Sequence, residues 1–250
     1  MHGFHPSTSG RRDAAAEPML HPPGPAPLAD MAPRLSIGPR PHGNASGELV
    51  KLHHSLVETV SEGTGIVAQF VAPERDAAIT RVVYDLAYVS ASWLGKRVLY
   101  VNGTEMRMDA NEPRRAGREE PRLAASFDPA ALERAITRVV GLELYQLNFP
   151  SMRGALDLAP ALREIPEFMG RLRQAFDLVV VASPPASEAP LGVLLSPYVD
   201  GNVLVLAAGR TRAPVADELR RSLQASGGAV VGVVLTGYRT FAPRWLRRWL

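Results

Sequence analysis

The chain has 250 residues, 46% of them hydrophobic and 21% charged, which is enough apolar material to bury one sizeable globular core. It contains no cysteine, which excludes disulfides, thiolate metal sites and a cysteine nucleophile. The net charge of +3 is too small to indicate a nucleic-acid partner. No apolar run reaches the roughly 20 residues that span a bilayer, and no signal-peptide core is present, so we expect a cytoplasmic protein.

Residues 1–45 form a leader rich in Pro, Gly, Ala and Ser, with nine of the 22 prolines of the chain. Such a composition cannot bury enough apolar surface to offset the entropy lost on ordering, so we expect the leader to be disordered. A Pro-rich docking peptide is the alternative. The folded domain is expected to occupy residues 46–250.

From residue 46 onward, segments with helix and strand patterns alternate. This alternation predicts an α/β fold with a doubly wound, mainly parallel sheet. The strand 178–182 is apolar throughout, as expected for a strand buried on both faces. In chain order we expect a helix at 47–60, a strand at 65–71, a helix at 76–94, a strand at 97–101, a helix at 129–139, a strand at 142–147, a helix at 161–176, strands at 178–182 and 202–207, a helix at 211–225 and a strand at 230–235.

Histidine placement restricts the chemistry of this domain. All six histidines lie in the first 54 residues, before the predicted sheet. A histidine-based triad or metal site within the sheet domain would therefore need residues from the leader. The motifs G-x-S-x-G and H-E-x-x-H are also missing from the sequence.

In such sheets, ligands bind at the carboxyl ends of the strands, where helix N-termini present backbone N–H groups. The loop after strand 65–71 consists of Pro73, Glu74, Arg75, Asp76, Ala77 and Ala78. A phosphate-binding P-loop needs glycines there, and a Lys where this chain has Ala77. Glu74 and Asp76 would repel phosphate, and Arg75 compensates only in part. We interpret the loop as a degenerate phosphate loop in which Asp76 caps the next helix.

Two further strand ends carry neutral residues where a metal-associated site has acidic ones. Asn102 and Thr104 follow strand 97–101, and Ala182 ends strand 178–182. Without carboxylates to hold a metal or orient water, phosphoryl transfer loses its electrostatic stabilisation. We therefore expect no catalytic residue, no metal ion and no cofactor; ATP with Mg²⁺ enters only under the alternative of an active enzyme.

Together these segments resemble the bacterial tyrosine kinases (BY-kinases) of capsule and exopolysaccharide synthesis, within the MinD/ParA-like P-loop group. The resemblance covers roughly residues 46–250. It implies a P-loop NTPase fold and, in the family, an ATP-dependent tyrosine kinase with acidic residues at the positions of Asn102, Thr104 and Ala182. The segments that carry it are KRVLYVNGTEMR, FDLVVVASPPAS and VDGNVLVLAAGRTRAPVADELRRSLQASGGAVVGVVLTGY.

An early helix of BY-kinases carries an E-x-x-R-x-x-R signature that is implicated in ring assembly. Glu48, Lys51 and His54 have this spacing and place. Residues three apart share a helix face, so an oligomer interface is one interpretation and an ordinary solvated face is the other.

The C-terminal tail lacks the tyrosine cluster of the family, with Tyr238 alone near the end. Its basic and aromatic residues suit contact with an anionic membrane or a partner, while packing onto the domain is the alternative. These residues are Arg244, Trp245, Arg247, Arg248 and Trp249.

These observations predict a non-catalytic pseudo-kinase or pseudo-ATPase in exopolysaccharide or capsule biosynthesis and export. The resemblance implies a membrane polymerisation or chain-length protein as partner, and so a place at the inner face of the membrane. Three alternatives stay open: an active or nucleotide-responsive kinase or ATPase that uses Arg75, a MinD-like membrane-associated positioning protein, and a scaffold unrelated to polysaccharide.

Overall fold

The computed structural model describes residues 34–36, 46–59, 65–76, 78–104, 129–148 and 158–237. The described strands are β1 (Arg34–Ser36), β2 (Ile66–Val71), β3 (Val98–Asn102), β4 (Thr137–Val139), β5 (Leu144–Asn148), β6 (Leu178–Ala182), β7 (Gly201–Ala207) and β8 (Val230–Thr236). The described helices are α1 (Ser46–Thr59), α2 (Ala78–Ser92), α3 (Pro129–Arg134), α4 (Leu158–Ala175), α5 (Leu191–Leu195), the 3₁₀ helix η2 (Ser196–Tyr198) and α6 (Ala213–Ala225).

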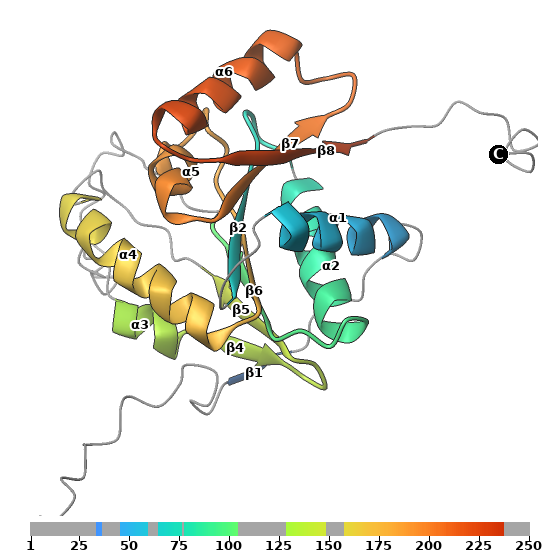
Figure 1. Ribbon diagram of the computed structural model, residues 1–250, viewed down its shortest axis with the longest axis vertical. Helices are drawn as coiled ribbons and strands as arrows, with labels where there is room; N and C mark the ends of the chain where they lie inside the picture. Colours follow the sequence, from blue (N-terminus) through green and yellow to red (C-terminus); the bar gives the residue numbers. More distant parts are fainter. Residues whose placement is uncertain are drawn as a thin grey trace, which may run out of the picture.

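The strands form one eight-stranded sheet in the order β1-β4-β5-β3-β6-β2-β7-β8 (Figure 1). Every pairing between neighbours from β5 to β8 is parallel, and β4 alone among the described strands pairs antiparallel, with β5. The predicted α/β class with a doubly wound, mainly parallel sheet is therefore confirmed.

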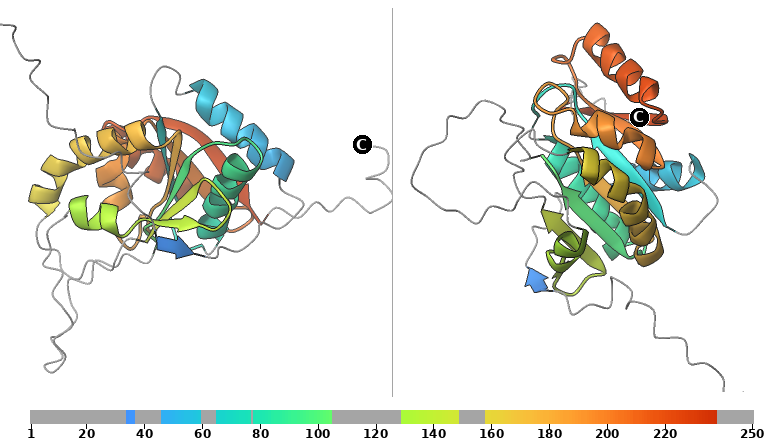
Figure 2. Two further views of the ribbon diagram at one scale, coloured as in Figure 1. Left: turned by 90° about the horizontal axis from the view of Figure 1, so that it is seen from below. Right: turned by 90° about the vertical axis from the view of Figure 1, so that its left-hand side faces the viewer.

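Helices cover both faces of the sheet (Figure 2). Helices α1 and α2 pack on one face, and α3, α4, α5 and α6 pack on the other. Side chains of the central strands alternate between the two cores: Val180 packs toward α2, whereas Val179 and Val181 pack toward α4. Because β6 is covered on both faces, its apolar sequence is what the fold requires.

The predicted helix at 129–139 is wrong in its second half. Helix α3 ends at Arg134, and Thr137–Val139 forms strand β4, which pairs with β5. Thr137 and Val139 are β-branched, which favours extended backbone once a neighbouring strand is available. The short helices α5 and η2 were also not predicted, because they are too brief for a helical repeat to stand out.

Strand β1 lies inside the segment that was predicted to be a disordered leader. Its residues Arg34–Ser36 pair in parallel with Thr137–Val139 at the edge of the sheet. The other residues of 1–45 lie outside the described residues, so the leader and the boundary at residue 46 stay predictions. Among the helices that the structure describes, none combines the length and apolar character needed to span a membrane.

Candidate functional site

The three loops singled out by sequence meet at one edge of the sheet. Strands β3, β6 and β2 are neighbours, so their carboxyl ends lie side by side. Backbone hydrogen bonds join the loops that follow: Gly103 N donates to Ala182 O (2.8 Å) and Ser183 N to Phe70 O (3.0 Å). The topology therefore builds a single site from segments that are far apart in the sequence.

The loop after β6 is also bonded to the degenerate phosphate loop. Ala186 N donates to Ala72 O and Ser187 N to Pro73 O, each at 3.0 Å. Beside these loops lies a pocket of about 230 Å³. Its lining consists of Ala72, Glu74, Arg75, Asp76, Ile79, Thr80, Thr104, Ser183 and Pro185.

Asp76 caps helix α2, as the sequence indicates. Its Oδ1 accepts a hydrogen bond from Ala78 N (2.9 Å), and its Oδ2 accepts one from the Thr236 hydroxyl at the end of β8 (3.0 Å). Both carboxylate oxygens are therefore engaged with the fold. The side chain satisfies a helix-terminal N–H group that a phosphate would otherwise contact.

Arg75 lies beside the pocket and is held by a carboxylate. Its Nε donates to Glu188 Oε1 at 2.7 Å, and its Nη2 donates to Glu188 Oε2. This hydrogen bond raises the pKa of the Arg75 guanidinium above its ordinary value. The Arg75 side chain is 54% exposed and that of Glu188 is 32% exposed, so water screens the pair.

Hydroxyl groups cover the part of the pocket near β3 and β6. The Thr104 hydroxyl donates to Asn102 Oδ1 (2.8 Å) and lies 3.2 Å from the Thr80 hydroxyl. Ala182, where the family resemblance implies an acidic residue, is fully buried. The next residue, Ser183, is 1% exposed, and its Oγ has no hydrogen-bond partner among the described residues.

These residues fit a phosphate group only in part. The Thr80 hydroxyl and the Arg75 guanidinium are suitable donors, whereas the Thr104 hydroxyl already donates to Asn102 Oδ1. The buried hydroxyl of Ser183 has no partner among the described residues. Glu74 adds a carboxylate to the same lining. For a metal ion the fit is poorer: within the described ranges, no group of three or more His, Cys, Asp or Glu is placed to hold one.

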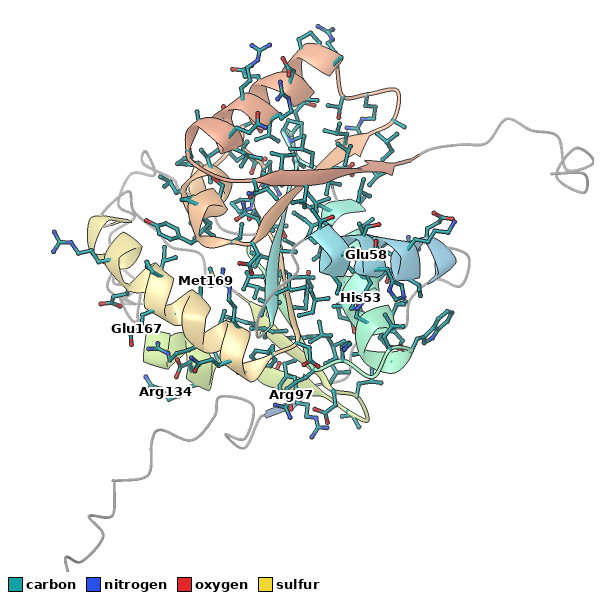
Figure 3. The ribbon with its side chains drawn as sticks, in the orientation of Figure 1. His53, Glu58, Arg97, Arg134, Glu167 and Met169 are labelled. Carbon is teal, nitrogen blue, oxygen red and sulfur yellow. The ribbon has the colours of Figure 1, made fainter. Side chains whose placement is uncertain are left out.

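Helix α1 presents the candidate interface residues to solvent. Glu48 and Lys51 are exposed and form an ion pair of 3.0 Å, and His54 is exposed on the same helix. Its neighbour His53 points inward (Figure 3) and hydrogen-bonds the Ser90 hydroxyl at 2.9 Å. Burial, helped by the charges of His54 and Lys96, lowers the pKa of His53. An oligomer interface on this face stays a prediction.

Two groups of predicted residues are not placed by the structure. Ala77 and the tail residues Arg244, Trp245, Arg247, Arg248 and Trp249 lie outside the described residues. Conversely, sequence reasoning did not single out Thr80, Ser183 or Glu188. Ser183 lies in the quoted segment FDLVVVASPPAS, but nothing in a sequence signals that a hydroxyl lacks a partner.

Three solved structures share this fold at low sequence identity. The kinase domain of the Escherichia coli tyrosine kinase ETK is 17% identical, with a TM-score of 0.60 over 80% of this chain and 79% of that chain. The BceF tyrosine kinase domain is 17% identical, with a TM-score of 0.57 over 76% and 74%. The septum site-determining protein MinD of Pyrococcus horikoshii OT3, complexed with Mg-ADP, is 15% identical, with a TM-score of 0.51 over 74% and 76%.

The expectation that the chain takes no cofactor is contradicted by these likenesses. Two of the structures are kinase domains and the third is a protein complexed with Mg-ADP, so the fold is one that holds nucleotides. The expectation rested on missing side chains alone. It overlooked the pocket at the strand ends and the hydroxyl groups that line it.

No protein-family model matches the chain, and no curated protein matches it. The likeness to solved structures, at under a fifth sequence identity, carries the assignment of the fold. It confirms the resemblance stated from the sequence motifs: this chain has the fold that BY-kinase domains share with MinD-like P-loop proteins.

Proposed function

We propose that this chain is a non-catalytic regulator or adaptor of exopolysaccharide or capsule biosynthesis and export. It acts at the inner face of the membrane through a membrane polymerisation or chain-length partner. The sequence resemblance to BY-kinases, together with the fold shared with tyrosine kinase domains, supports this setting. In this proposal the chain can bind a ligand in the pocket but does not turn that ligand over.

The observation that carries the proposal is the chemistry at the carboxyl ends of β3 and β6. Asn102 and Ala182 pair in register there, and neither side chain is a carboxylate. The Asn102 amide oxygen already accepts hydrogen bonds from Thr104 N (3.2 Å) and the Thr104 hydroxyl (2.8 Å). Phosphoryl transfer relies on groups that neutralise developing charge and orient the nucleophile, and these two positions supply neither.

The acidic residues of the neighbouring loop do not replace the missing carboxylates. Asp76 is engaged by Ala78 N and the Thr236 hydroxyl, on the side of the helix α2 N-terminus. Glu74 is exposed on the loop. Each carboxylate adds negative charge beside the place that a phosphate group would take, which opposes binding.

Turnover by the full-length chain is the first test. We expect neither ATP hydrolysis nor tyrosine autophosphorylation above the level of a protein-free control, with Mg²⁺ and millimolar ATP. The variant Arg75→Ala serves as the matched control for contaminating activity. Turnover that the native chain shows and Arg75→Ala lacks would contradict the proposal.

The biological setting needs a second test. Deletion of the gene should lower the amount or length of the exported polysaccharide, and the full-length chain should restore it. Chemical cross-linking in intact cells should then capture a membrane protein of the same export system. Unchanged polymer in the deletion strain would contradict the proposed setting, whatever the turnover assay gives.

A nucleotide-responsive kinase or ATPase with an atypical site is the second candidate. Two residues that line the pocket favour this second candidate: Ser183, whose hydroxyl has no partner among the described residues, and Arg75. Hydroxyl and guanidinium groups both bind phosphate oxygens. It differs from the first candidate in one measurable respect: γ-phosphate is released or transferred.

A further inference from the structure

Arg75 is the one cationic side chain among the described residues that line the 230 Å³ pocket. It binds Glu188 through two parallel N–H···O contacts, from Nε to Oε1 (2.7 Å) and from Nη2 to Oε2. This planar, two-point arrangement is the one by which guanidinium groups also bind phosphate. In the observed conformation, the donors of Arg75 that suit a phosphate are therefore taken by a carboxylate of the same chain.

Glu188 is presented to Arg75 by an ordered turn. Glu188 N donates to Pro185 O (2.9 Å), and the preceding residue, Ser187, donates its N–H to Pro73 O (3.0 Å). The second of these bonds attaches the turn to the loop that carries Arg75. The backbone of Glu188 is thus fixed relative to the loop that carries Arg75.

We propose that Glu188 is an internal competitor of phosphate at Arg75. The Arg75–Glu188 pair and the binding of a phosphate-bearing ligand in the pocket exclude each other, and Glu188 sets how tightly such a ligand binds. This inference rests on the proposed function only in taking the ligand to occupy the same pocket. It assigns a role to a residue outside the degenerate motifs.

Three observations make the exchange physically reasonable. Ser183 is one of the residues that line the pocket, and its buried hydroxyl has no hydrogen-bond partner among the described residues. The first turn of the 15-residue helix α2 also borders the pocket, and its positive dipole end is partly offset by the capping carboxylate of Asp76. The ion pair itself is solvent-screened, so its exchange for another anion costs little.

The carboxylates of the lining explain why Arg75 has to take part. Glu74 and Asp76 both line the pocket and carry charge of the same sign as a phosphate. Hydroxyl donors alone do not offset that repulsion, whereas a guanidinium does so while donating two hydrogen bonds. While Glu188 holds Arg75, the local balance favours an empty pocket.

The test is calorimetric titration of the full-length chain with two probes, inorganic pyrophosphate and ADP, each without metal. Glu188→Gln keeps the size of the side chain and removes its charge. We expect it to tighten binding roughly two- to fivefold, because the exposed ion pair that competes with the ligand contributes only modestly. Tighter binding of both probes identifies the phosphate group as the ligand, and a gain confined to ADP identifies the nucleotide.

Two controls separate this effect from a general change in charge. Glu167→Gln removes a carboxylate that pairs with Arg171 on α4 and is more exposed than Glu188, and it should leave binding unchanged. The double variant Arg75→Ala with Glu188→Gln should bind no better than Arg75→Ala alone. Melting temperatures of all variants should match that of the native chain to show that they are folded.

Several outcomes overturn the inference: equal binding by the native chain and Glu188→Gln, no binding by either, or a gain that survives Arg75→Ala. These results are independent of the turnover assay. ATP turnover together with tighter binding by Glu188→Gln would refute the proposed function but support the competition between Glu188 and phosphate. If the chain shows no turnover and Glu188→Gln binds no more tightly, the proposed function stands and the competition is refuted.

Discussion

The two ends of the parallel sheet use their polar side chains differently. At the amino end, Asp200 accepts hydrogen bonds from Val67 N (2.8 Å) and from Arg173 Nε and Nη2 (3.0 and 2.8 Å), and Asp177 accepts one from Arg97 N (2.8 Å). At the carboxyl end, the Ser183 hydroxyl is buried without a partner, and the Arg75–Glu188 pair is screened by water. Polar groups at the amino end hold strands together, whereas at the carboxyl end one buried hydroxyl is unsatisfied and one ion pair is exposed to water.

The contrast indicates where stability and where ligand recognition reside. A polar group whose bonding capacity is satisfied by the fold contributes to stability, whereas an unsatisfied one reduces it and stays available to a ligand. Substitutions at the two ends should therefore change the free energy of unfolding by different amounts. Removing the unsatisfied Ser183 hydroxyl should raise it, whereas removing a satisfied carboxylate should lower it.

The largest effect is expected for Asp200→Ala at the amino end. It leaves Val67 N and the Arg173 guanidinium without their acceptor, which should lower the free energy of unfolding by roughly 2–4 kcal/mol. Urea denaturation followed by circular dichroism measures it. The control Asp217→Ala removes a surface carboxylate paired with Arg220 and Arg221 on α6 and should leave the transition unchanged. Equal losses of unfolding free energy in the two variants would contradict the assignment of stability to the amino end of the sheet.

A smaller loss is expected for Asp76→Ala at the carboxyl end. The variant removes the acceptor of Ala78 N and of the Thr236 hydroxyl, which should cost about 1–2 kcal/mol. Asp76→Asn retains a capping oxygen and should recover most of that loss. If both substitutions destabilise the chain equally, the charge of Asp76 and not its capping bond supports the fold.

The smallest effect, and the one of opposite sign, is expected for Ser183→Ala. Removing a buried hydroxyl without a partner should raise the free energy of unfolding by up to about 1 kcal/mol in the absence of ligand. The same variant should weaken pyrophosphate binding. Thermal unfolding with and without pyrophosphate measures both changes. A loss of stability in the ligand-free chain would show that the hydroxyl already serves the fold.

Strand and helix patterns predicted most of the fold because the apolar segments are strongly periodic. The strand 178–182 matches β6 residue for residue, since an all-apolar strand has sharp boundaries. Strand β4 was misread because Ala135 to Val140 continues the apolar pattern of α3, and only pairing with β5 decides its conformation. In this segment the pairing with β5 outweighs the local preference for a helix.

The sequence pointed to the three loops of the candidate site but not to the contacts that those loops make. The three loops were recognised because ligands bind at the carboxyl ends of parallel strands. The Arg75–Glu188 pair joins residues 113 positions apart, and the isolation of the Ser183 hydroxyl depends on everything packed around it. Neither fact can be read from the local sequence, because each depends on contacts made only in the folded chain.

The backbone bonds between the two loops beside the pocket also bear on how the site opens. Because Ala186 N and Ser187 N donate to Ala72 O and Pro73 O, neither loop moves away from the other without breaking those bonds. Local unfolding of such a region is cooperative. The amide hydrogens of Ala186 and Ser187 will therefore show the same protection against exchange with solvent, set by a single opening event that exposes both loops together.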